Sequence, residues 1–103
     1  MTHIDEKIDV WFYDRGIAQN ATELSQATKM LEEVTEVFDA ISTGNREDFA
    51  DALGDVYVTL RGLALVSDMP LDYCIEQAYD EIKNRKGYLR EDGTFIKQLE
   101  LDI

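Results

Sequence analysis

The chain has 103 residues, with 10 Lys and Arg against 22 Asp and Glu, so its formal net charge is −12. This length predicts one domain spanning residues 1–103, and the negative charge argues against a nucleic-acid partner. The hydrophobic share of 45% and the single proline disfavour intrinsic disorder. We find no apolar run long enough to span a membrane and no secretory signal, and one cysteine cannot form an internal disulfide; we therefore expect no membrane partner and a cytoplasmic location.

The first two predicted helices occupy the N-terminal half of the chain. The first carries apolar residues at helical spacing and is expected to end at Gly16: Ile4, Ile8, Trp11 and Phe12. The second is expected to begin after an N-cap at Thr22 and to end at Thr43-Gly44. Its apolar stripe consists of Ala27, Met30, Leu31, Val34, Val37, Phe38 and Ile41.

Two further helices are predicted after residue 44. Asn45 would cap the third, and Pro70 lies near the first position of the fourth, which would end before Gly87. Four helices with short connections predict an all-α four-helix bundle. Beyond Gly87 the turn signal Asp92-Gly93, flanked by apolar residues, is compatible with either a short hairpin or an extended arm.

Acidic residues follow the edges of the apolar stripes on two predicted helices. The second helix carries Glu32, Glu33 and Glu36, and the third carries Asp48, Asp51 and Asp55. If these helices pack antiparallel, the carboxylates converge, which is unfavourable without a cation. Oxygen-only ligands select Mg²⁺ or Mn²⁺. A di-iron site is excluded because the only histidine is His3. The alternative is that all these acids are solvated surface residues.

A basic cluster at residues 83–87 could complement the acids. Lys83, Arg85 and Lys86 could simply stabilise the end of the fourth helix, where the helix dipole favours cations. Together with a metal held by carboxylates, however, such cations are suited to binding and cleaving a polyphosphate. The glycine-rich loop of P-loop enzymes is absent.

These patterns, taken in order, resemble the MazG-type all-α nucleoside triphosphate pyrophosphohydrolases, particularly the short single-domain members. The matching segments are Trp11 with Arg15-Gly16-Ile17, Lys29-Met30-Leu31-Glu32-Glu33 with Glu36, Leu53-Gly54-Asp55-Val56, Glu81-Ile82-Lys83-Asn84-Arg85-Lys86-Gly87 and Gly93-Thr94-Phe95-Ile96-Lys97. The resemblance implies the all-α pyrophosphatase fold with a short extended C-terminal arm. It also implies a homodimer or a dimer of dimers.

The resemblance further implies roles for individual residues. Glu33, Glu36 and Asp55 would bind Mg²⁺, for which Mn²⁺ could substitute. The family pattern has a glutamate where this chain has Ala52, which leaves open whether Asp51 is a ligand instead. Glu32 is the first candidate and Glu36 the second for orienting or deprotonating the attacking water. By the same resemblance Lys83 and Arg85 would bind the phosphates. Lys29 and Trp11 are further expected substrate-binding residues.

The predicted activity is Mg²⁺-dependent hydrolysis of a nucleoside triphosphate, preferentially a deoxynucleoside triphosphate, to the monophosphate and pyrophosphate. Its role would be control of the nucleotide pool or removal of unwanted nucleotides. The alternative is a non-enzymatic acidic helical module that imitates nucleic acid or inhibits a basic protein. Trp11 is expected in the core, with stacking on a nucleobase as its alternative role. Cys74 is expected to be a small buried residue.

Overall fold

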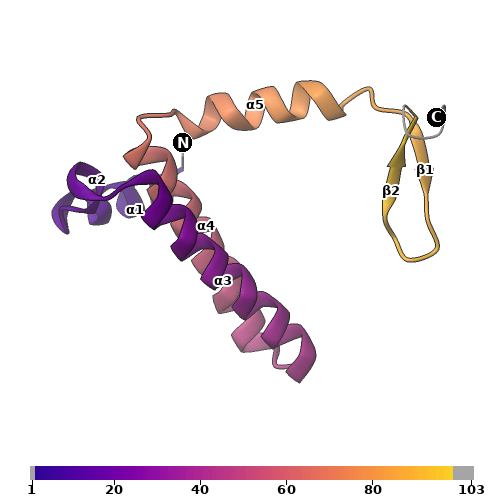
Figure 1. Ribbon diagram of the computed structural model, residues 1–103, viewed down its shortest axis with the longest axis horizontal. Coiled ribbons are helices and arrows are strands. Elements are labelled where there is room, and N and C mark those ends of the chain that lie inside the picture. The colour runs from indigo at the N-terminus through magenta and orange to yellow at the C-terminus, as the bar shows by residue number, and fades with distance from the viewer. Residues whose placement is uncertain (1, 99–103) are drawn as a thin grey trace. The chain divides into compact units, whose positions relative to one another are not determined.

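The structure is a computed structural model that describes residues 2–98. It consists of five helices and one short antiparallel hairpin, which confirms the predicted all-α fold with an extended C-terminal arm. The chain divides into two compact units, residues 1–71 and 72–103, which are described separately (Figure 1). Among the described residues, no helix is both long and apolar enough to cross a membrane.

The first unit is built on two long helices that lie side by side. They are α3 (Glu23–Thr43) and α4 (Arg46–Val66), and Gly44, with a φ of 72°, makes the tight turn between them (Figure 1). The shorter helices α1 (His3–Asp14) and α2 (Ile17–Asn20) also contact α4. The antiparallel pairing of α3 and α4 is the arrangement in which the sequence analysis expected the carboxylates of the two helices to converge.

Side-chain caps fix where the two long helices begin. The hydroxyl of Thr22 accepts a hydrogen bond from the Ser25 amide, and the Asn45 side chain accepts from the Glu47 and Asp48 amides at 3.1 Å. Both predicted N-caps are therefore confirmed. Gly16 adopts a φ of 75° and ends the first helix region as predicted, but the chain then forms α2, which the sequence analysis missed because four residues carry too short a pattern.

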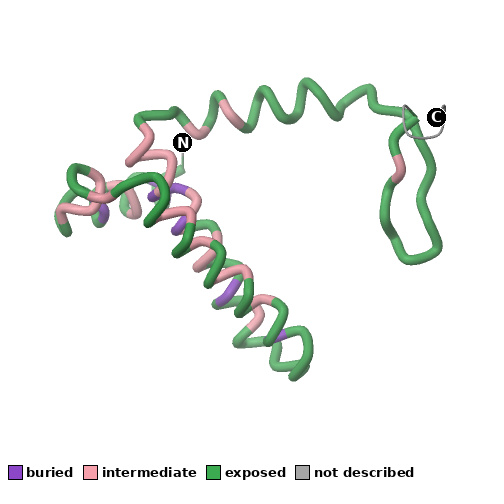
Figure 2. The backbone as a smooth tube through the Cα atoms, viewed as in Figure 1, coloured by how far each residue is buried: buried purple, intermediate pink, exposed green. Residues whose placement is uncertain are grey.

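The core of the first unit is small. Its buried hydrophobic residues are Phe12, Ala40 and Ala52, with exposed fractions of 3%, 4% and 4% (Figure 2). The expectation that Trp11 is a core residue is wrong, since 44% of it is exposed. Its neighbour Phe12 takes the core position because it points from α1 toward Gly62 of α4.

Three large apolar residues of α3 have no partner among the described residues of the first unit. Leu24, Leu31 and Phe38 are spaced seven residues apart and are 77%, 65% and 66% exposed. Because a spacing of seven keeps residues on nearly one line along a helix, they form a continuous apolar row. We call these three residues the α3 row. Helix α4 covers only one side of the stripe, so the row faces outward.

The second unit contains α5 (Leu71–Ile82), which begins directly after Pro70 as predicted, and two strands. β1 (Gly87–Leu89) pairs antiparallel with β2 (Phe95–Lys97), with Tyr88 opposite Ile96. The arm that the sequence left open is thus a hairpin. Cys74 on α5 is only partly buried, which differs from its expected burial.

Candidate functional site

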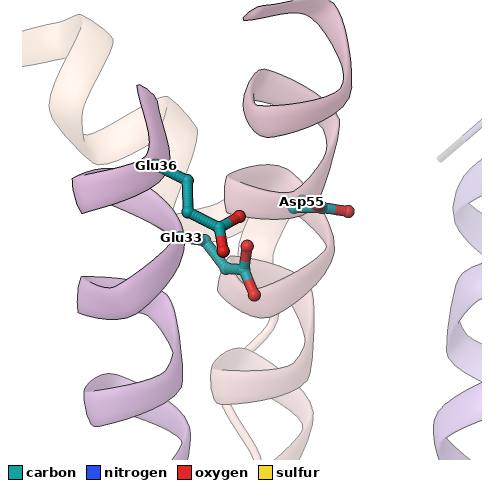
Figure 3. Close-up of side chains that lie close together, drawn as sticks. All are labelled: Glu33, Glu36 and Asp55. Atoms are coloured by element: carbon teal, nitrogen blue, oxygen red, sulfur yellow. The ribbon is translucent and has the colours of Figure 1, made fainter. Parts of the chain in front are cut away.

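Three carboxylates from α3 and α4 come together. One oxygen each from Glu33, Glu36 and Asp55 lies within 4.8 Å of the others, and Figure 3 shows both glutamates reaching from α3 toward α4. Glu33 and Glu36 are three residues apart and so lie on neighbouring turns of one helix face. We call these three residues the carboxylate group.

The carboxylate group is electrostatically unfavourable without a cation. Partial burial raises the pKa of Glu33, and the adjacent carboxyl of Glu36 raises it further. Partial burial also raises the pKa of Asp55, with smaller contributions from the negative charges of Asp51 and Glu36. Glu33 and Asp55 therefore give up part of the preference for the ionised form that they have in water, and a bound cation would restore that preference.

The donors fit a small hard cation. All of them are carboxylate oxygens, the ligand type that Mg²⁺ and Mn²⁺ prefer. Octahedral Mg²⁺ with bonds of 2.0–2.1 Å holds its ligand oxygens about 2.9 to 4.1 Å apart. Oxygens within 4.8 Å of one another lie close to that spacing. The group can hold a metal, with water and substrate oxygens supplying the remaining ligands.

An acidic hollow of about 270 Å³ adjoins the carboxylate group and shares Glu36 with it. Its lining consists of Glu36, Asp39, Ala40, Thr43, Asp48, Asp51 and Ala52. The structure does not bring Asp51 into the carboxylate group, although the charge of Asp51 acts on Asp55. Ala52, which stands where the family pattern has glutamate, is buried against α3 and supplies no ligand.

A family comparison gives this site its context. A family model described as phosphoribosyl-ATP pyrophosphohydrolase matches residues 3–82. The chain belongs to this family. No curated protein and no solved structure matched the chain. The phosphoribosyl-ATP pyrophosphohydrolase family is all-α and lies within the MazG-like all-α NTP pyrophosphatase superfamily, so the resemblance is confirmed at that level and not for the MazG family itself.

Membership of the phosphoribosyl-ATP pyrophosphohydrolase family supports a hydrolase that acts on phosphoric anhydrides. Such enzymes typically depend on a divalent metal, which agrees with the carboxylate group. The match spans α1 to α5 and includes every member of that group. The alternative of an acidic interaction module gains no support from the comparison.

Glu32 and Lys29 lie outside the carboxylate group. They form an ion pair with each other, with 3.1 Å between Lys29 Nζ and Glu32 Oε2, and both side chains are more than half exposed. The Glu32 carboxylate raises the pKa of Lys29, first through the hydrogen bond and then through its charge.

Trp11 borders an apolar hollow of about 280 Å³ on the first unit, which we call the Trp11 hollow. Its lining residues are Lys7, Ile8, Trp11 and Val58. Val58 lies three residues after Asp55 on α4, so the hollow is one helical turn from a member of the carboxylate group. The guanidinium of Arg15 lies 5.2 Å from the centre of the Trp11 ring and stacks on it.

The predicted phosphate-binding cations belong to the second unit. Lys83 follows α5 directly and pairs with Asp80 at 3.1 Å, where both side chains are largely exposed. Arg85 is exposed, and its amide donates a hydrogen bond to the Ile82 carbonyl. A pairing one turn back along a helix is also what simple stabilisation of the helix end would give.

Sequence reasoning missed a buried ionic cluster in the first unit. Arg61 of α4 is buried and contacts Asp5 and Asp9 of α1 together with Tyr57. The signal was present, because Arg61 is the one cation in the apolar second half of α4, and a buried charge requires a partner. Two aspartates four residues apart on α1 were available as that partner.

Proposed function

We propose that this protein is a Mg²⁺-dependent nucleoside triphosphate pyrophosphohydrolase that releases pyrophosphate and a nucleoside monophosphate. The observation that carries the proposal is the carboxylate group, which joins two helices at one point with oxygen donors only. Family membership supports the cleavage of a phosphoric anhydride. The biological role would be control of the nucleotide pool or removal of unwanted nucleotides.

Glu33, Glu36 and Asp55 are the proposed metal ligands. These three residues would hold a divalent cation, which would supply neutralisation of phosphate oxygens and a more acidic water. Glu32 is the proposed general base, since it stands one residue from a ligand yet outside the carboxylate group, where it pairs with Lys29. Glu36 is the second candidate, although binding the metal would reduce its basicity. Asp51 remains a further candidate ligand.

The substrate would be recognised at two further places. Lys83 and Arg85 are proposed to bind the phosphates, because charge-assisted hydrogen bonds suit phosphate oxygens. Lys29 keeps two ammonium hydrogens beyond its bond to Glu32 and is proposed as an additional phosphate contact. Trp11 is proposed to stack on the nucleobase, since it borders an apolar hollow of about 280 Å³.

We also propose that two copies of the chain associate through the α3 row, as a homodimer or within a dimer of dimers. The row leaves Leu24, Leu31 and Phe38 exposed by 77%, 65% and 66%. A core in which Phe12 is the largest buried hydrophobic side chain stabilises a single copy weakly. Pairing two such rows would bury them in a helical seam with residues at heptad spacing.

A pyrophosphate-release assay tests the function. The panel should contain the common ribo- and deoxyribonucleoside triphosphates and phosphoribosyl-ATP, each with Mg²⁺ and with a chelator. The proposal expects pyrophosphate from at least one nucleoside triphosphate in Mg²⁺ only. Turnover of phosphoribosyl-ATP alone would correct the substrate, and no turnover of any compound would favour the acidic interaction module. Size-exclusion chromatography with light scattering tests the dimer by measuring the molar mass. Wild type should have at least twice the mass of one chain, and Leu31→Glu should have the mass of one chain.

A further inference from the structure

The buried cluster around Arg61 joins α1 to α4 by polar contacts on several sides. Arg61 Nε donates to Asp9 Oδ1 at 2.9 Å, and its Nη2 donates to Asp9 Oδ2 at 2.8 Å. The hydroxyl of Tyr57 donates to Asp5 Oδ1 at 2.7 Å, and Arg61 Nη1 lies 3.8 Å from Asp5 Oδ2. We call Asp5, Asp9, Tyr57 and Arg61 the Arg61 cluster.

The three charged members of the Arg61 cluster are shielded from water, whereas Tyr57 is 36% exposed. The side chains of Arg61, Asp5 and Asp9 are only 8%, 10% and 18% exposed. A two-point bond between a guanidinium and a carboxylate fixes both the distance and the angle between the helices that carry them. Ion pairs of this kind contribute little net stability compared with apolar packing, so their value lies in the geometry that they specify.

The Arg61 cluster holds α1 against α4 in the position that forms the Trp11 hollow. Three of the four lining residues of the hollow, Lys7, Ile8 and Trp11, belong to α1, whereas Val58 belongs to α4. Asp9 is next to Ile8 in the chain and two residues from Trp11. A shift of α1 along α4 would therefore change the hollow. It would leave the carboxylate group intact, because all three of its members lie on α3 and α4.

We propose that Arg61 is a positioning residue that sets the nucleobase-binding hollow relative to the metal-binding carboxylates. This inference rests on the proposed function and adds to it a determinant for substrates that carry a base. Arg61 acts through Asp9 and α1 and touches no substrate. Displacements of about 1 Å in positioning groups can reduce rates about a hundredfold, so a small movement of α1 suffices.

The test compares ligands with and without a base in the full chain. The probes are the α,β-methylene analogues of dATP and dCTP, and inorganic tripolyphosphate, each titrated with Mg²⁺ by calorimetry. In Asp9→Asn the amide nitrogen faces the guanidinium and weakens the two-point bond. We expect Asp9→Asn to weaken binding of at least one analogue about tenfold and that of tripolyphosphate by less than about twofold. Asp14→Asn makes the same change at an exposed position of α1 and is expected to alter neither.

Tryptophan fluorescence gives an independent readout, because Trp11 is the only tryptophan in the chain. The analogues are expected to quench its emission and tripolyphosphate is not. In Asp9→Asn the emission should move to longer wavelength as the ring becomes more exposed to water. If Asp9→Asn does not fold, Tyr57→Phe provides a milder variant, since it keeps the Arg61–Asp9 pair and removes only the hydroxyl bond to Asp5.

Equal weakening of the analogues and tripolyphosphate would overturn the inference, because the Arg61 cluster would then act on stability alone. So would unchanged analogue binding in both variants, or a wild-type protein that binds the analogues no better than tripolyphosphate. Each of these outcomes overturns the positioning role of Arg61 and remains compatible with a metal-dependent phosphate site. If the wild-type protein binds none of the three probes with Mg²⁺, the proposed function fails and the positioning role fails with it.

Discussion

The ring of Phe12 on α1 packs directly against Gly62 on α4, so closely that a Cβ atom at position 62 would lie 2.5 Å from two ring carbons. Only glycine fits this contact. The neighbouring residue, Arg61, forms the polar contact with the same helix. Two consecutive residues of α4 therefore hold α1 by an apolar contact and an ionic one.

This contact predicts opposite effects of one substitution at two glycines of α4. Gly62→Ala should lower the free energy of unfolding by about 1–3 kcal/mol, because the added methyl group overpacks the Phe12 contact. Gly54→Ala, whose Cβ would meet nothing within 4 Å, should raise it by about 0.5–1 kcal/mol through helix propensity. Urea unfolding of both variants measures this. A Gly62→Ala variant with a free energy of unfolding equal to or above that of wild type would contradict the packing of α1 on α4.

Acid should weaken the attachment of α1. The hydrogen bond from Tyr57 is the main cause that lowers the pKa of Asp5, followed by the bond from the Thr2 backbone amide. A carboxyl whose folded-state pKa lies below its unfolded value adds stability above the unfolded value, and this stability is lost as the pH falls through the folded value. Tyr57→Phe should therefore lower the melting temperature at pH 7. The difference from wild type should shrink as the pH falls below about 4. A difference that stays constant with pH would show that the Tyr57 hydroxyl stabilises the protein without lowering the pKa of Asp5.

Pyrophosphate release should depend on a divalent cation. Mg²⁺ and Mn²⁺ should both support it, because the carboxylate group offers only oxygen ligands. Ca²⁺ should bind and give little turnover, since its looser coordination positions water and phosphate poorly. Steady-state rates in each metal and in a chelator measure this. Full activity in metal-free buffer would contradict the proposed chemistry.

Substitutions of Lys83 and Arg85 distinguish a role in phosphate binding from a role in capping α5. Lys83→Ala or Arg85→Ala should reduce kcat/KM about tenfold or more, because each loses a charge-assisted bond of about 1.5–3 kcal/mol. The melting temperature should hardly change. Arg90→Ala, which removes an exposed cation paired with Asp92 in the hairpin of the same unit, should keep its kcat/KM. If Lys83→Ala instead loses stability and retains its kinetics, Lys83 serves the end of α5.

Much of the helical pattern was predictable because its signals are local. Thr22 and Asn45 cap helices through their own side chains, and Gly16 and Gly44 adopt positive φ angles that other residues rarely reach. The outer side of the apolar stripe could not be predicted in the same way. A helical period identifies Leu31 and Phe38 as apolar but does not say whether a neighbouring helix or a second copy covers them.

The candidate site was predictable in part for a similar reason. Spacing places Glu33 and Glu36 on one helix face, and the pairing of α3 with α4 brings Asp55 to them. Spacing could not separate Asp51 from Asp55, since both lie on one edge of α4 and only three-dimensional geometry distinguishes them. Nor could it show that Phe12 would be buried and Trp11 exposed, because adjacent residues on a helix differ by about 100°.

The central claim is that Glu33, Glu36 and Asp55 together hold a divalent cation, and thermal melts of wild type and Asp55→Asn with and without Mg²⁺ test it most directly. Asp55→Asn keeps the shape of the side chain and removes one repelling charge, so the metal-free variant should be more stable by on the order of 1 kcal/mol and inactive. Saturating Mg²⁺, at a hundredfold excess over its dissociation constant, should add about 2.7 kcal/mol to wild type and much less to the variant. Asp51→Asn in the same series shows whether that residue is also a ligand, and Asp14→Asn is the surface control. If Asp55→Asn is less stable without metal and gains as much from Mg²⁺ as wild type does, Asp55 is a structural acid and the proposed site is wrong.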